Sequence, residues 1–218
     1  MTDRRFDCAA VLFDADGVLV DSDASVTSAW SRWAVAYHLD PERVVNMVHG
    51  RRSADTVALL VPGNEEQALR DVDAAELADA ATVQAVPGAR ALLDDLNRAG
   101  TPWAVVTSAT RALARARHEA AGLPVPVATV TADDLREGKP DPAGYRMAAK
   151  LLGVTPSACV VLEDSASGIA AARAADVGAV IGVSARAASH HPDVTVQDLT
   201  SVRVGPRGLL VDAPEPPR

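Results

Sequence analysis

The sequence predicts an α/β fold in which a doubly wound parallel sheet is interrupted by an all-helical insertion. From residue 87 onward, short apolar runs alternate with helical segments, a pattern typical of doubly wound sheets. Another apolar run lies at residues 10–13, and residues 23–86 between the two parts show no strand-like alternation. We therefore expect an α/β core of residues 1–21 and 87–218, with a helical cap of residues 22–86.

Length and composition limit the possible classes of function. At 218 residues, the chain is long enough for one core with a smaller insertion. Charged residues make up 23%, no apolar run approaches the about 20 residues of a membrane span, and the first residues lack the apolar segment of a signal peptide. We therefore expect a cytoplasmic protein without a membrane partner, either a monomer or a weak homo-oligomer. The net charge of -8 argues against a nucleic-acid partner, because phosphate backbones are bound by basic surfaces.

The first expected strand runs directly into two carboxylates, Asp14 and Asp16. Ligands of parallel sheets lie beyond the carboxyl ends of the strands, so these acids would stand at a ligand site. Gly17 tolerates a positive φ and allows a sharp turn, which brings the carboxylate and the backbone carbonyl of Asp16 toward one small volume. Two acids and a carbonyl suit a hard cation.

The insertion reads as a series of helices with its own apolar face. Trp30, Trp33 and Tyr37 are spaced so that they share one side of the first helix, and we interpret them as the core of the helical unit. The expected helices cover residues 23–37, 41–48, 53–60 and 65–84.

A basic cluster, His49, Arg51 and Arg52, lies between two of these helices in an otherwise acidic insertion. It is suitably placed to meet a polar substrate when a cap closes over a site. Arginine pairs also often decorate helix ends, so the sequence leaves open which of these residues touches a substrate.

The remainder of the core alternates between helices and apolar strands. With the first strand, the count supports about five parallel strands, and a Gly-Pro-Arg-Gly segment predicts a C-terminal hairpin near residues 202–211, followed by a frayed tail. The expected helices are 89–98, 111–121, 143–152 and 167–175, and the expected strands are 103–106, 127–130, 159–162 and 177–183.

Groups that bind phosphate follow two further segments. Thr107 and Ser108 end an apolar strand before a helix, where hydroxyls and backbone N–H groups can hold an oxyanion, although such residues are also common helix caps. Lys139, one of only two lysines, lies between Gly138 and Pro140, so its backbone is restrained as few surface lysines are.

Two adjacent acids, Glu163 and Asp164, end another buried strand. They would repel each other unless a cation is present, and one of them could instead cap the following helix. With Asp14 and Asp16 they complete a set of hard oxygen ligands of the kind that Mg²⁺ prefers.

These four segments, in this order, resemble the four motifs of the haloacid dehalogenase-like superfamily, in particular its phosphotransferase branch, which has both acids of the first motif. The resemblance implies a Rossmann-like core and a helical cap of the first type. It also implies that Asp14 is the nucleophile, that Asp16 is the general acid and base, and that Asp164 binds the metal directly. Glu163 would act through water or neighbouring contacts, while Thr107, Ser108 and Lys139 would hold the phosphoryl group.

Within this superfamily, the residues favour a phosphatase acting on a small phosphorylated sugar or sugar alcohol. Dehalogenases lack the second acid, and phosphonatases use a cap lysine, whereas this chain has no lysine before Lys139. The segments 29–33 and 46–51 resemble those of sugar and polyol phosphate phosphatases, including glycerol-phosphate phosphatases. Two alternatives stay open: a mutase resembling β-phosphoglucomutase, and a non-catalytic protein that binds sugar phosphates.

Overall fold

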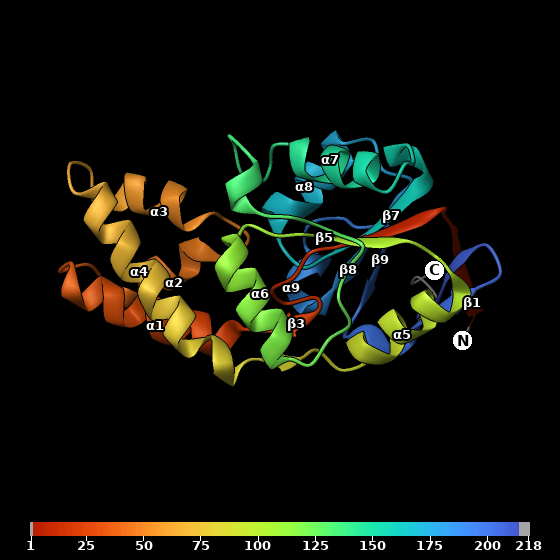
Figure 1. The fold of residues 1–218 in the computed structure, drawn as a ribbon, viewed down its shortest axis with the longest axis horizontal. Coiled ribbons are helices and arrows are strands. Elements are labelled where there is room, and N and C mark those ends of the chain that lie inside the picture. Colours follow the sequence, from red (N-terminus) through yellow and green to blue (C-terminus); the bar gives the residue numbers. More distant parts are fainter. Residues whose placement is uncertain (1, 214–218) are drawn as a thin grey trace.

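The structure, a computed structural model, describes residues 2–213. The tail predicted at the C-terminus falls mostly on residues 214–218, outside this range. Figure 1 shows two parts side by side, an α/β core that carries both termini and a bundle of helices at the opposite end. Within residues 2–213, no helix is both long enough and apolar enough to span a membrane.

A sheet of six parallel strands forms the centre of the core, in the order β6-β5-β2-β7-β8-β9. The five predicted strands are confirmed, and β2 lies centrally, paired with β5 and β7. The sixth strand, β9, corrects the expected count of about five. It was not predicted because it has only three residues and follows a segment that reads as a loop. The strands are β2 (Ala10–Phe13), β5 (Trp103–Val106), β6 (Ala128–Val130), β7 (Cys159–Glu163), β8 (Ala179–Val183) and β9 (Val194–Val196).

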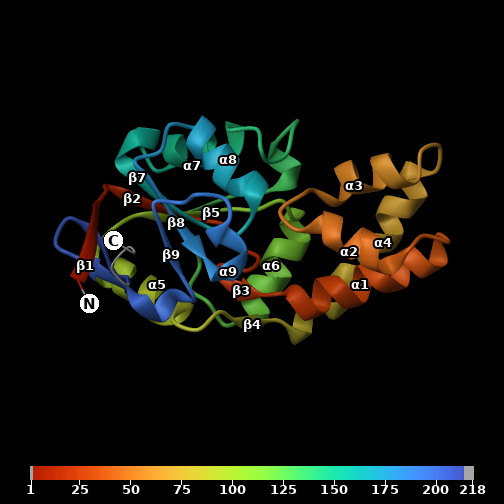
Figure 2. The same ribbon diagram turned by 180° about the vertical axis from the view of Figure 1, so that it is seen from behind.

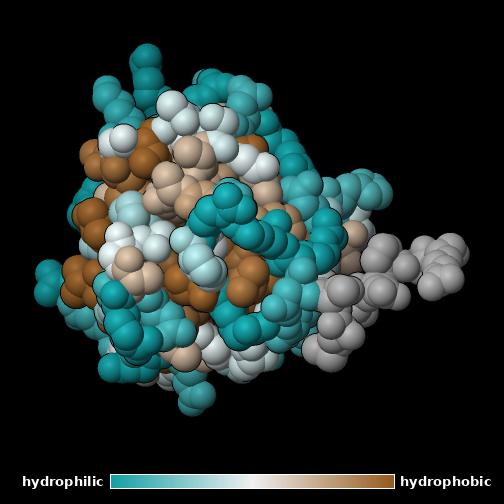
Figure 3. Space-filling model, turned by 90° about the vertical axis from the view of Figure 1, so that its right-hand side faces the viewer, coloured by the Kyte–Doolittle hydropathy of each residue, from teal (hydrophilic) through white to brown (hydrophobic). Residues whose placement is uncertain are grey.

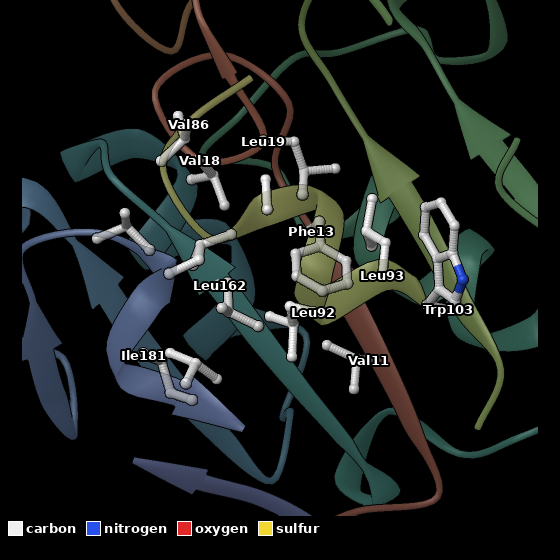
Figure 4. Close-up of a cluster of buried hydrophobic side chains, with 14 of the residues drawn as sticks. Val11, Phe13, Val18, Leu19, Val86, Leu92, Leu93, Trp103, Leu162 and Ile181 are labelled. Atoms are coloured by element: carbon white, nitrogen blue, oxygen red, sulfur yellow. The ribbon is translucent and has the colours of Figure 1, made fainter. Parts of the chain in front are cut away.

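Helices cover both faces of this sheet, as expected of a doubly wound fold (Figures 1 and 2). On one face, α7 and α8 pack with small buried residues of β2, β5 and β7. On the other face, Phe13 and Trp103 meet edge to face with ring centroids 6.0 Å apart, and leucines of α5 pack near them (Figure 4). The core helices are α5 (Ala89–Ala99), α6 (Arg111–Ala120), α7 (Ala143–Leu151), α8 (Ala166–Ala174) and α9 (Ser184–Ala188).

The helical unit has its own hydrophobic cluster, as its aromatic spacing predicts. Trp30 and Trp33 are buried, with ring centroids 5.2 Å apart, and Trp33 Nε1 donates to the carbonyl of Ala68 at 2.8 Å. The unit consists of α1 (Asp23–Ala36), α2 (Pro41–Val48), α3 (Ser53–Leu60) and α4 (Glu65–Asp79), followed by a short 3-10 helix at Ala80–Thr82.

Two antiparallel features lie outside the main sheet. Strand β4 (Gln84–Ala85) pairs with β3 (Val20–Asp21) where the chain enters and leaves the helical unit, so the expectation that residues 23–86 contain no strand is wrong for two residues. The predicted hairpin is confirmed as β10 (Val202–Gly205) and β11 (Gly208–Ala213).

The N-terminal strand β1 (Thr2–Asp7) joins this hairpin by pairing with β11. This strand is not among those predicted from the sequence, because the segment is rich in charged residues and lacks an apolar run. Apolar and polar residues are interspersed on this end of the molecule (Figure 3). The remaining 3-10 helices are Ala132–Asp134, Pro156–Ala158 and Leu199–Ser201.

Candidate active site

A cavity lies between the carboxyl ends of the sheet strands and the helical unit. The core contributes Asp14, Asp16 and Asp164 to its lining, and the helical unit contributes Trp30 and His49 among others. Acids that are up to 150 residues apart in the chain therefore face one volume, as the doubly wound topology predicts for groups at strand ends.

Lys139 is the central cation of the core side. Its Nζ lies 2.5 Å from Asp14 Oδ1 and 2.5 Å from Glu163 Oε1, and its side chain is 6% exposed. Burial alone would lower the pKa of Lys139, but the carboxylates of Asp14 and Glu163 outweigh it and raise that pKa well above the ordinary value. Burial also raises the pKa of Asp14, an effect that Lys139 opposes. The structure thus places Lys139 in direct contact with Asp14, the first of the predicted site acids.

Glu163 uses both of its oxygens to organise its surroundings. Oε1 accepts from Lys139 and from the Tyr145 hydroxyl at 3.0 Å, and Oε2 accepts from the backbone N–H groups of Asp164 and Ser165 at 2.8 and 2.9 Å. With its acceptor positions engaged and no exposed surface, Glu163 is placed to fix the turn after β7. Tyr145, buried on α7, is not among the site residues predicted from the sequence.

The residues fit a divalent cation. Oxygens of Asp14, Glu163 and Asp164 lie within 4.8 Å of one another, all buried, which is a hard donor set of the kind that Mg²⁺ and similar ions take. Burial, followed by the charge of Glu163, raises the pKa of Asp164 to about 7. The carboxylate of Asp16 is not part of this cluster, so a contribution of Asp16 to a metal would come through its backbone carbonyl.

Gly17 is required at its position by a close approach. Its φ is +79°, and a Cβ there would lie 2.2 Å from Asp164 Oδ2. The turn after β2 can therefore pass this close to Asp164 only with glycine at this position.

Thr107 and Ser108 follow β5 at the same edge of the sheet. Thr107 is 2% exposed, and its Oγ1 accepts from the Ala109 N–H at 3.1 Å. Ser108 Oγ donates to the carbonyl of Gly50 in the helical unit at 3.1 Å, and Ser167 Oγ donates to the same carbonyl at 3.1 Å. Ser108 thus holds the loop between α2 and α3 against the core.

Arg117, in the last turn of α6, is a second buried cation and was not identified from the sequence. Its Nη1 donates to Asp16 Oδ1 at 2.9 Å, and its Nη2 donates to Glu76 Oε1 of α4 at 3.0 Å. Burial raises the pKa of Glu76, and Arg117 opposes that effect. Spacing could have revealed the pair: Arg117 follows the buried Leu113 by four positions, and Glu76 follows the buried Val72 by four, so each shares a face with an apolar neighbour.

The three basic residues predicted to meet substrate have different environments. His49 and Arg51 line the cavity, whereas Arg52 does not. Arg52 instead forms a two-pronged ion pair with Asp55 at 2.8 and 2.7 Å and donates to the carbonyls of Leu135 and Arg136. Its contacts join the helical unit to the loop that precedes Lys139.

Arg186 also lines the cavity and was not predicted as a site residue from the sequence. It lies on the five-residue helix α9, and its Nη1 is 2.7 Å from Asp164 Oδ2 and 3.4 Å from His49 Nδ1. Its Nη2 is 2.6 Å from Asp23 Oδ2 of α1, so it too links core and helical unit. Burial, followed by the charge of Arg186, lowers the pKa of His49.

Comparison with known proteins is consistent with this geometry. Residues 8–176 match the model of the haloacid dehalogenase-like hydrolases, a stretch that contains the strand ends and the helical unit described above. The chain belongs to this family.

Several characterised relatives of the protein are phosphatases. It is 42% identical to hexitol phosphatase A of Escherichia coli (strain K12) over 83% of this chain and 85% of the relative. It is 32% identical to glycerol-1-phosphate phosphohydrolase 2 of Saccharomyces cerevisiae over 90% of this chain and 84% of the relative. It is also 33% identical to a β-phosphoglucomutase of Mycobacterium bovis, over 88% and 90% of the two chains.

Solved structures share the fold. A hydrolase from Pseudomonas syringae superimposes with a TM-score of 0.80 at 24% identity, covering 88% of this chain and 94% of the other. The two chains therefore share one fold over most of their lengths.

Proposed function

We propose that this protein is a Mg²⁺-dependent phosphatase that hydrolyses the phosphate monoester of a small sugar or sugar alcohol through an aspartyl-phosphate on Asp14. The observation that carries the proposal is the convergence of Asp14, Lys139, Glu163 and Asp164 at one sheet edge, beneath a helical unit. The phosphatase relatives, named for hexitol and glycerol-1-phosphate substrates, support the substrate class. We propose residues 22–86 as the cap, with 1–21 and 87–218 as the core.

In the first step, a carboxylate oxygen of Asp14 attacks phosphorus and the bond to the substrate oxygen breaks. Lys139 holds Asp14 Oδ1 and directs the other oxygen toward the substrate. Asp16 donates a proton to the leaving alcohol oxygen. Its Oδ1 already accepts from Ser22 Oγ at 2.6 Å and from Arg117, so Oδ2 is the oxygen that carries the proton.

In the second step, water attacks the phosphorus of the aspartyl-phosphate, Asp16 takes the proton from that water, and the bond between Asp14 and phosphorus breaks. Lys139, Thr107 and Ser108 position the phosphoryl oxygens throughout. When bound, Mg²⁺ supplies positive charge to the phosphoryl oxygens, and Asp14, Asp164 and the carbonyl of Asp16 would hold it, with Glu163 acting on its surroundings.

The test is phosphate release from hexitol, glycerol and hexose phosphates, with Mg²⁺ and with a chelator. We expect release that requires Mg²⁺ and falls to background in Asp14→Asn, while Asp94→Asn, an exposed acid on α5, keeps it. Absence of release from every ester by the wild-type protein would rule out the phosphatase.

A mutase is the second candidate, because the β-phosphoglucomutase relative matches nearly the whole chain. It would return the phosphoryl group to a sugar rather than to water. Isomerisation of a sugar phosphate that depends on a sugar bisphosphate primer would identify the mutase. If the protein has neither activity, the remaining alternative is a non-catalytic protein that binds sugar phosphates. The proposal includes a cytoplasmic monomer or weak homo-oligomer that binds neither nucleic acid nor membranes.

A further inference from the structure

The helical unit places one acid deep in the cavity wall. Glu76 is 4% exposed and lines the same cavity as Asp14 and Asp16, together with Arg117, which is 3% exposed. Glu76 Oε2 accepts from Ser53 Oγ at 3.1 Å, and Oε1 accepts from Arg117 at 3.0 Å. Among residues 2–213, Arg117 Nε is one of two buried side-chain nitrogen or oxygen atoms without a hydrogen-bond partner. This subsite therefore holds one buried donor, Arg117 Nε–H, that no residue around it satisfies.

The position of this pair relates it to the reacting atoms. Arg117 donates to Asp16 Oδ1, and Asp16 serves the ester oxygen in the proposed function, on which this inference rests. In the proposed function, the carboxylate of Asp16 therefore lies between the ester oxygen and Arg117, and Glu76 lies on the other side of the guanidinium group. The parts of the substrate expected nearest to the pair are those next to the ester carbon, on the leaving alcohol.

A hydroxyl group matches this subsite chemically. It can accept from an arginine N–H or from Ser53 and donate to a carboxylate oxygen in the same contact. A buried donor left without an acceptor carries a desolvation penalty, so a ligand hydroxyl that meets it is favoured. An alkyl group at the same place would leave the Arg117 Nε–H without an acceptor.

The balance of charge at this pair disfavours a second anionic group beside it. Arg117 is one positive charge shared between two carboxylates, Asp16 and Glu76, so the three together carry an excess of negative charge. Of the two other arginines that line the cavity, Arg51 and Arg186, the second already has Asp164 and Asp23 as partners. A carboxylate or second phosphate on the leaving alcohol would face Glu76 at close range.

We propose that Glu76 and Arg117 form a hydroxyl-binding subsite that selects phosphate esters of neutral, polyhydroxylated alcohols over esters that lack the adjacent hydroxyl or carry a second anionic group.

Three phosphate esters with the same reacting group test this proposal: glycerol phosphate, propyl phosphate and 3-phosphoglycerate. For the wild-type protein, we expect kcat/KM with glycerol phosphate to exceed that with each of the other two by roughly tenfold or more. In Glu76→Gln, both ratios shrink by roughly tenfold, because the amide has only one acceptor oxygen and no charge. Glu66→Gln makes the same change on an exposed part of α4 and leaves both ratios at their wild-type values.

A structural role for Glu76 would lower kcat/KM equally for all three esters, and that result overturns the proposal. A wild-type protein that hydrolyses propyl phosphate or 3-phosphoglycerate as well as glycerol phosphate also overturns it, whether or not the Glu76 variant folds. If the wild-type protein releases no phosphate from any ester, the proposed function itself has failed, and the two failures are therefore distinct.

Discussion

Two buried cations in this molecule each hold a pair of carboxylates, and they differ in where those carboxylates come from. Lys139 binds Asp14 and Glu163, which both belong to the α/β core. Arg117 binds Asp16 of the core and Glu76 of the helical unit. The first cluster is complete within the core, and the second exists only when the helical unit lies against the core.

In the proposed function, this difference separates two tasks of the site. The groups that we propose to meet the phosphoryl oxygens have to hold a fixed geometry, and the core alone supplies them. Groups that meet the variable alcohol come from both parts, so they can change with the helical unit while the core chemistry stays the same. Substitutions in the two clusters should therefore have different signatures.

The largest effect is expected from breaking the core cluster. Lys139→Met leaves Asp14 and Glu163 without their shared cation and removes a charge beside the phosphoryl group, so kcat/KM should fall by at least about 10³-fold for every ester. Phosphate release measures this, with Lys150→Met, the other lysine of the chain and exposed on α7, as the control. Loss confined to one ester would contradict a role at the phosphoryl group.

Breaking the second cluster should reduce both activity and stability. Arg117→Met leaves Glu76 buried without its ion-pair partner, which should destabilise the fold by about 3 kcal/mol. Activity on a polyol phosphate should fall by roughly a hundredfold, because the orientation of Asp16 is lost as well. Chemical denaturation and phosphate release measure the two effects, and Arg115→Met, exposed on the same helix, should change neither. Unchanged stability would mean that the Arg117 and Glu76 contact contributes nothing.

A smaller effect should follow from disturbing the contact between the two parts at Gly50. Its φ is +72°, and a Cβ would lie 2.5 Å from Ser165 Oγ and 2.7 Å from Ser167 Oγ. Gly50→Ala should therefore push the α2–α3 loop away from the core and lower kcat/KM by roughly tenfold, beyond the loss of stability that alanine at a positive φ causes in any case. Gly63→Ala has a similarly positive φ of +92° with nothing within 4 Å, so it should retain full activity. Equal loss in both variants would show that backbone strain, not docking, is responsible.

The smallest effect concerns Asp73, one turn before Glu76 on α4. Burial, with the charges of Glu76 and Asp133 adding to it, raises the pKa of Asp73 to about 6. A raised pKa favours the protonated folded state, so stability is lost as pH rises through about 6. Asp73→Asn should therefore be about 1 kcal/mol more stable than the wild type above this pH, allowing for solvent screening at a partly buried site, and equal to it below about pH 4.

Asp71, on the same helix, serves as a control because its pKa is shifted in the opposite direction to that of Asp73. Hydrogen bonds from Tyr37 and Gln67 lower its pKa, so its contribution to stability is present at neutral pH and lost as pH falls. Asp71→Asn should be less stable than the wild type at neutral pH. Denaturant unfolding at a series of pH values gives the free energy of unfolding of each variant. If this free energy varies with pH in the same way for both variants, the opposite directions of the two pKa shifts are refuted.

The core part of the site could be predicted because local patterns encode it. Asp14, Lys139 and Asp164 each stand where a strand or a restrained loop ends, and parallel topology brings such ends together. Arg117 and Glu76 are interior residues of helices, and their contact joins positions 41 residues apart that meet through the packing of two units. Only their spacing from buried apolar neighbours indicates that these two residues are buried. In helices with many charged residues, this indication is weaker than a strand end is for the core residues.

The strands likewise differ in how clearly a local sequence pattern encodes them. The buried strands of the sheet are apolar runs, so five of them could be read from the sequence. Strand β9 is three residues long, and β1 is charged because it lies at the edge of a small antiparallel sheet, so neither has an apolar pattern long enough to recognise.

The central claim is that Asp14 accepts the phosphoryl group before water does. The stereochemistry at phosphorus tests it most directly, using a polyol phosphate made chiral at phosphorus with sulfur and oxygen isotopes and hydrolysed in isotopically labelled water. Two successive in-line displacements, first by Asp14 and then by water, predict retention of configuration. Inversion would mean that water attacks the substrate directly and would contradict a covalent role for Asp14.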